Sequence, residues 1–210
     1  MFKNINRVVK TLVVTDFFVN AAFGSFGPVF AIFITGQIAG GSASVAGYAA
    51  ASYWIIKSLV QLPIARFLDR ADGEKSHFWA MFLGFFFSSF VPIAYLFVET
   101  PFHLYVLEGI HGFIMAWAVP AWYAIFTRHV DKWRISFEWS LESVFSVGLA
   151  TAGASALGGY VFDHFGYQVL FLSAGIVSMI ASLLILTLAP HLSPSKQQER
   201  VLPERQKRHK

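Results

Sequence analysis

Six apolar runs, each about as long as a membrane-spanning helix, dominate this sequence of 210 residues. A helix needs about 20 predominantly apolar residues to cross the hydrocarbon core of a bilayer. The runs cover residues 12–34, 45–65, 78–98, 104–126, 137–162 and 167–188. They predict an all-α membrane protein with six transmembrane helices.

The basic residues lie on one side of these runs. Every Lys and Arg except Lys57 precedes the first run, follows the last, or lies between runs 2 and 3 or runs 4 and 5. The opposite connections, residues 35–44, 99–103 and 163–166, contain no Lys or Arg. Because cytoplasmic loops carry the excess of Lys and Arg, both termini are predicted to be cytoplasmic.

Composition excludes several classes of protein. A chain that is 56% hydrophobic and only 13% charged has too much apolar surface for one soluble core of this size. We therefore expect a multi-pass protein of a cell membrane, the inner membrane of a prokaryote, with membrane lipids around it. The net charge of +4 comes from short connections and a tail, so no nucleic-acid partner is expected. The sequence contains no phosphate-binding loop and no nucleophile motif. We therefore expect no enzymatic activity and no cofactor.

The sequence divides into two parts. Residues 1–190 form the predicted six-helix bundle, and residues 191–210 form a polar segment with two prolines and six basic residues. Such a segment has too little apolar surface to fold alone, so we expect a disordered basic cytoplasmic tail.

A few ionisable side chains interrupt the apolar runs. A charge at the bilayer centre costs about 2.5–3.5 kcal/mol on insertion scales, so each needs a reason. Lys57 is expected near the midplane, with Asp16, Asn20 and Glu142 between it and the cytoplasmic side. Either Lys57 pairs with Asp16 or Glu142 and fixes the helix packing, or it faces a cavity as a substrate or coupling site.

Two further features lie in runs 4 and 5. Glu108 and His111 are one helical turn apart, and their roles as a coupling or gate pair and as a packing pair both remain open. A metal site needs further carboxylates at the same depth, so none is expected. Gly153, Gly158 and Gly159 predict a helix face that a neighbouring helix can approach closely.

Two stretches resemble motifs of the major facilitator superfamily. Residues 65–75 read A-R-F-L-D-R-A-D-G-E-K, similar to the loop motif G-x-x-x-D-R-x-G-R-K. Residues 154–167 read A-S-A-L-G-G-Y-V-F-D-H-F-G-Y, similar to G-P-x-x-G-G-x-x-x-x-x-x-G-[WY]. Glu74 stands where the family has a basic residue, and Ser155 where it has proline.

The resemblance implies a fold and a function. The six helices resemble one half of a transporter of this superfamily, whose two halves are related by an axis along the membrane normal. It implies secondary active transport of a small-molecule substrate by alternating access, with two copies forming a parallel homodimer. Asp69 and Arg70, with Arg128 as the partner of Asp69, would form a cytoplasmic gate. The alternative is a membrane scaffold or assembly partner that does not transport.

Overall fold

The computed structural model describes residues 5–70 and 73–192. The elements are α1 (Arg7–Gln37), α2 (Ala43–Arg70), α3 (Lys75–Ser88), α4 (Phe90–Ala94), the 3-10 segment η2 (Tyr95–Phe97), α5 (Pro101–His129), α6 (Ile135–Leu141), the π-helical segment η3 (Glu142–Leu149), α7 (Ala150–Leu184) and the 3-10 segment η4 (Ile185–His191). These described residues include no strand, in agreement with the predicted all-α class. The predicted disordered tail lies outside the described residues from 193 onwards.

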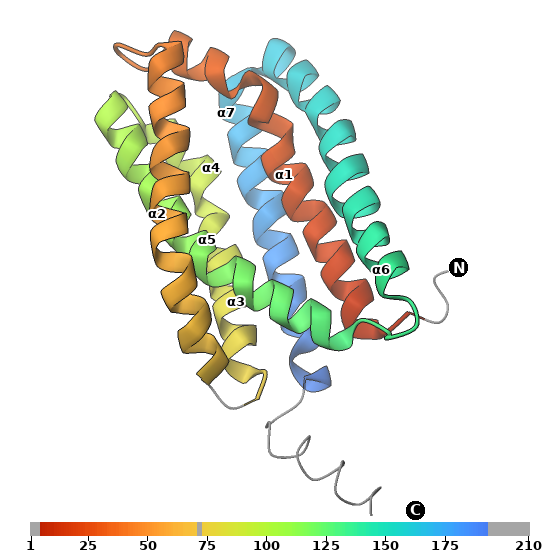
Figure 1. The fold of residues 1–210 in the computed structure, drawn as a ribbon. Helices are drawn as coiled ribbons and strands as arrows, with labels where there is room; N and C mark the ends of the chain where they lie inside the picture. Colours follow the sequence, from red (N-terminus) through yellow and green to blue (C-terminus); the bar gives the residue numbers. More distant parts are fainter. Residues whose placement is uncertain (1–4, 71–72, 193–210) are drawn as a thin grey trace, which may run out of the picture.

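The helices stand side by side in one bundle (Figure 1). We call each helical stretch that runs from one end of the bundle to the other a limb. One limb each is formed by α1, α2, the segment α3–α4–η2, and α5. The stretch from α6 to η4 forms two limbs, because the chain turns back at Gly166, whose φ of 83° is in the left-handed region that glycine adopts easily. The described residues thus form six limbs. The connection predicted over residues 163–166 is concentrated in this single turn.

Four stretches are long and apolar enough to cross a membrane, as judged by length and composition. They are Arg7–Gln37, Lys75–Phe97, Pro101–His129 and Ile135–His191, of which the last contains the two limbs that meet at Gly166. α2 is not among them, and it contains Lys57, Arg66 and Arg70. Membrane crossing by α2, and the cytoplasmic placement of the termini, stay predictions.

The two ends of the bundle differ in charge. α1 begins and η4 ends at the same end (Figure 1). The ends of α2 and α5 also lie there, with Arg70 and Arg128. Connections at the other end, residues 38–42 and 98–100 and the turn at Gly166, have no Lys or Arg. Among the described residues, the basic side chains other than Lys57 therefore gather at one end, as the sequence predicts.

Local chemistry sets where the limbs begin. The Asn6 side chain accepts a hydrogen bond of 2.9 Å from the Val8 backbone N–H and so caps α1. Thr100 caps α5, and Pro101 occupies its first turn, where the missing N–H costs nothing. These caps satisfy donors that the helix itself leaves unpaired.

The third limb is broken between α3 and α4. Ser88 and Ser89 donate their hydroxyls to the carbonyl oxygens of Phe85 and Phe86, at 2.9 and 2.6 Å. Pro92 removes a backbone donor one turn later, which weakens the helix at this point. The limb bends there and ends in the 3-10 turn of η2.

The closest helix contact is between α1 and α7. A Cβ added at Gly158 would lie 1.8 Å from the carbonyl oxygen of Ser25, so only glycine fits there. Ser155 donates a 2.9 Å hydrogen bond to the Gly24 carbonyl oxygen in the same contact. A Cβ added at Gly153 or Gly159 would meet no atom within 4 Å. Of the three predicted packing glycines, Gly158 therefore lies in the α1–α7 contact, and the other two point to open space.

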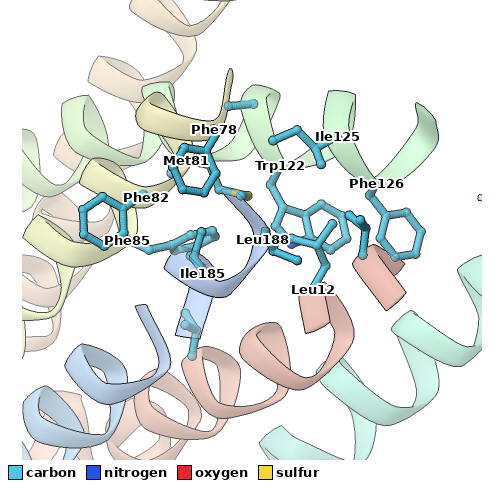
Figure 2. Close-up of a cluster of buried hydrophobic side chains, with 14 of the residues drawn as sticks. Leu12, Phe78, Met81, Phe82, Phe85, Trp122, Ile125, Phe126, Ile185 and Leu188 are labelled. Atoms are coloured by element: carbon cyan, nitrogen blue, oxygen red, sulfur yellow. The ribbon is translucent and has the colours of Figure 1, made fainter. Parts of the chain in front are cut away.

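A cluster of buried apolar side chains fills the basic end of the bundle. Figure 2 shows side chains of this cluster from several elements, among them Leu12 of α1, Met81 and Phe85 of α3, Trp122 of α5 and Leu188 of η4. A second cluster, with Phe33 and Phe171, fills the other half. Two cavities described below adjoin these clusters.

We predict that Gly158→Ala destabilises the protein by about 1–3 kcal/mol, because overpacking a tight contact forces the backbones apart. Thermal unfolding in detergent measures the change. Gly159→Ala, at the adjacent position with open space, serves as the matched control and should leave the melting temperature unchanged or slightly raised. Equal melting curves for the two variants would contradict the close contact.

Candidate functional site

An acidic cavity of about 260 Å³ lies beside the first apolar cluster. Residues of α1, α3, α5, α6 and η3 line it, namely Asp16, Val19, Asn20, Phe85, Met115, Val119, Trp122, Tyr123, Trp139, Glu142 and Val147. It contains three of the polar residues that the sequence places within apolar runs: Asp16, Asn20 and Glu142. We call it the acidic cavity.

Asp16 and Glu142 both line this cavity and are close enough for their carboxyl groups to influence each other electrostatically. Asn20 donates a 2.7 Å hydrogen bond to Asp16 Oδ2 and a 3.0 Å bond to the Asp16 backbone carbonyl oxygen. The amide therefore fixes the Asp16 carboxyl, and Glu142 lines the same cavity. Two carboxyl groups that lie close together can hold one proton between them.

Glu142 is the first residue of the π-helical segment η3. π-helical turns are rare and occur frequently at functional sites, because they re-aim side chains within a helix. The segment is tied to α1 by Ser146, whose hydroxyl donates a 2.9 Å hydrogen bond to the Val13 carbonyl oxygen. The irregular segment thus presents Glu142 to α1 at a defined depth.

Lys57 lies apart from this acid pair. Of the residues that the structure describes, none forms an ion pair with its ammonium group. The ammonium nitrogen is instead 4.8 Å from the ring centroid of Trp54 and 5.4 Å from that of Tyr53. The side chain is buried. Neither of the ion pairs considered for Lys57, with Asp16 or with Glu142, is present.

A second cavity, of about 240 Å³, lies further along α1. Aromatic residues of α1, α2 and η2 make most of its wall, and Glu108 and His111 of α5 complete it: Phe23, Phe26, Phe30, Ala46, Ala50, Tyr53, Trp54, Tyr95, Glu108 and His111. We call it the aromatic cavity. The structure therefore places the Glu108–His111 pair in a different cavity from Asp16 and Glu142.

Glu108 has one strong partner in the aromatic cavity. The Tyr95 hydroxyl donates a 2.5 Å hydrogen bond to Glu108 Oε1. His111 Nδ1 is 3.9 Å from Glu108 Oε2, and its ring stacks on Phe23 with centroids 5.2 Å apart. Tyr95 was not predicted as a site residue, because a tyrosine in an apolar run gives no sequence signal for its partner.

The predicted cytoplasmic gate has two carboxylate–histidine contacts. Asp69 Oδ1 is 3.8 Å from His77 Nε2, and Glu74 Oε1 is 3.6 Å from His129 Nδ1. The second contact joins the start of α3 to the end of α5. Arg70 and Arg128 are exposed. The sequence had suggested Arg128 as the partner of Asp69, and it gave no indication of His77 or His129.

Comparison with known proteins gives the family. The family model described as Major Facilitator Superfamily matches residues 12–209. The chain belongs to the major facilitator superfamily. Neither the curated proteins nor the solved structures searched contain a match. The superfamily is one of membrane transporters, so this chain is a multi-pass membrane protein of a transporter-type family.

Membership explains the loop between α2 and α3. Gly73, the glycine of the loop motif, has a φ of 74°, so the motif glycine makes a tight turn before α3. Glu74, at a position where the motif has a basic residue, is buried against His129. This member of the superfamily therefore ties its loop to α5 with a carboxylate at that position.

The described residues contain no group of three or more His, Cys, Asp or Glu side chains that could hold a metal ion. Each cavity contains two ionisable side chains, Asp16 and Glu142 in the acidic cavity and Glu108 and His111 in the aromatic cavity. Aromatic side chains line both cavities, and the amide of Asn20 lines the acidic one.

We predict that Glu74→Gln loosens the basic end of the bundle, because it removes the charge that faces His129. His129 Nδ1 is also 3.0 Å from the Ile125 carbonyl oxygen. A shift of His129 should therefore raise the exposure of Ile125, which is buried in the wild type. A cysteine at Ile125 should react with a maleimide several-fold faster in the variant. The matched control is Glu99→Gln, which removes an exposed carboxylate at the other end. Equal maleimide reaction rates in Glu74→Gln and the wild type would show that the Glu74–His129 contact does not hold this end of the bundle closed.

Proposed function

We propose that this protein is a secondary active transporter that couples the movement of a small solute to protons by alternating access. The observation that carries the proposal is the Asp16–Glu142 carboxyl pair inside a cavity of a transporter-family bundle. Buried carboxyl groups in a membrane segment are costly, and proton relays in transporters are a recurring reason to keep them.

The acid pair suits proton coupling because its charge depends on one proton. With one proton held between Asp16 and Glu142, the pair has a single negative charge and an internal hydrogen bond. Without it, two like charges face each other in a low-dielectric site and repel. That repulsion acts between α1 and η3, so proton loss favours their separation.

The π-helical segment η3 is the part of the backbone that can move in response to this repulsion. A π-helical turn contains an extra residue relative to an α-helix, and it can shift by small backbone adjustments. Gly148 lies within the segment, and Ser146 holds it to Val13. We propose that η3 adjusts with the protonation of Glu142 while the Gly158 contact keeps α1 and α7 together.

We further propose that the working unit is a parallel homodimer. In Figure 1, α1 and α5 cross one face of the bundle, and α5 starts beside α2 and ends near the connection to α6. A two-fold partner over this face would enclose both cavities, since residues of α1 and α5 line each of them. Small residues that a partner helix could approach closely, Ala152, Gly153 and Ala156, lie exposed on α7.

We predict that transport depends on the acid pair. Protein reconstituted in vesicles that contain a pH-sensitive dye should move protons when a substrate from a panel of small solutes is added. Asp16→Asn and Glu142→Gln should lower the initial rate more than tenfold, because neither variant can share a proton between two carboxyl groups. Glu99→Gln is the matched control and should keep the wild-type rate.

Two outcomes would count against transport. Flux that persists in both acid-pair variants would remove proton coupling from this site. Absence of flux for every solute, in vesicles shown to contain inserted protein, would favour a non-transporting membrane scaffold or assembly partner.

We predict that the protein in lipid nanodiscs has the mass of two chains. Gly153→Leu should shift it toward one chain, because the bulky side chain blocks close approach at the exposed small-residue face. Ile180→Leu, a change at an exposed position on the limb after Gly166, is the control and should stay dimeric. A wild-type protein with the mass of a single chain would exclude the homodimer.

A further inference from the structure

The aromatic cavity is separate from the acid pair, and its chemistry points to a ligand. Its walls include the rings of Phe23, Phe26, Phe30, Tyr53, Trp54 and Tyr95. Several of these rings contact one another, with centroids of Phe30 and Tyr95 4.8 Å apart and of Tyr53 and Trp54 5.1 Å apart. The rings are therefore held in place by packing before any ligand arrives.

One acidic group faces this aromatic wall. Glu108 is only 7% exposed, and of its two carboxylate oxygens Oε1 accepts the Tyr95 hydrogen bond. Oε2 lies 3.9 Å from His111 Nδ1, which is beyond hydrogen-bonding distance. A buried carboxylate with one hydrogen bond is stabilised further by a cation close to it.

Two rings of the same wall already lie close to a cation. The Lys57 ammonium nitrogen lies over the rings of Trp54 and Tyr53, within the range of a cation–π interaction. Lys57 itself does not line the cavity. The rings of Trp54 and Tyr53 thus contact an ammonium group and also line the cavity. Trp54 is 59% exposed, so the cavity is open to the surface beside this ring.

A metal ion does not suit this cavity. Among the described residues, no cluster of three or more ligating side chains is present, and Glu108 and His111 are the only such residues in the wall. Aromatic faces with a single carboxylate are instead typical of sites for quaternary ammonium and other organic cations. The volume of about 240 Å³ is sufficient for a small one.

We propose that the aromatic cavity binds a small organic cation, with Glu108 as its counter-charge and Phe23, Phe30, Tyr53 and Trp54 as its walls. Tyr95 positions the Glu108 carboxylate, and His111 closes the site next to Phe23. The inference rests on the proposed transport function, since it names the class of substrate that the transporter would move. Binding itself is measured without any transport.

The test is equilibrium binding of radiolabelled tetraethylammonium to the purified full chain in detergent. We expect saturable binding that choline displaces, whereas the neutral analogue of choline, with tert-butyl in place of trimethylammonium, displaces it at least tenfold less well. Glu108→Gln keeps the shape and should weaken binding at least tenfold. Glu99→Gln, at an exposed acid, is the matched control and should bind as the wild type does.

A second pair of variants tests the aromatic wall. Phe30→Leu should weaken binding several-fold, because it removes a ring face from the cavity. Phe97→Leu, at a 76% exposed phenylalanine outside the cavity, should not change binding. Size-exclusion profiles and melting curves check that each variant is folded.

The outcomes separate this inference from the transport proposal. Absence of saturable binding, equal displacement by the neutral analogue, or unchanged binding in Glu108→Gln would overturn the cation site, even if other solutes are transported. Binding with the expected losses, but without flux of tetraethylammonium or choline into vesicles, would support the site and count against transport of these cations.

Discussion

The contact between α1 and α7 is the constraint on which the rest of the bundle depends. Gly158 lets the two backbones approach so closely that a single Cβ would overlap the Ser25 carbonyl oxygen. Ser155 adds a hydrogen bond to α1 in the same contact, and Ser146, on the same limb, adds another at a different depth. In a membrane, where the surrounding lipid is as apolar as the helices, such close packing and interhelical hydrogen bonds supply the association energy. With this limb fixed to α1, Glu142 faces Asp16.

Much of the fold follows from the distribution of apolar and basic residues. A helix in lipid must satisfy its own backbone groups, so a run of suitable length has few alternatives to a helix. Local backbone choices are harder to predict. The break at Ser88 and the turn at Gly166 depend on hydroxyl–backbone bonds and a positive φ within otherwise helical stretches. The π-helical turn at Glu142 has no sequence signature, because it depends on how η3 meets α1.

The sequence predicted the depth of the candidate site residues along the bundle better than the direction in which each side chain points around its helix. Counting residues from the basic end places Asp16 and Glu142 at similar depth, and the structure brings them together. The same count does not say which way Lys57 points around α2, and the aromatic rings of Trp54 and Tyr53 provide its surroundings instead. Tyr95 and Glu108 are 13 residues apart across a change of limb, so their hydrogen bond appears only once the limbs are packed.

The two cavities occupy successive turns of the same pair of helices. On α1, Asn20 lines the acidic cavity and Phe23 the aromatic one; on α5, Met115 and His111 have the same relation. Residues three or four apart share one face of a helix, so each helix exposes a continuous stripe to both cavities. Any shift of α1 relative to α5 that accompanies the adjustment of η3 must also move Phe23 against His111, on which it stacks. Proton binding and ligand binding would then be coupled through one rigid helix, with no longer pathway required.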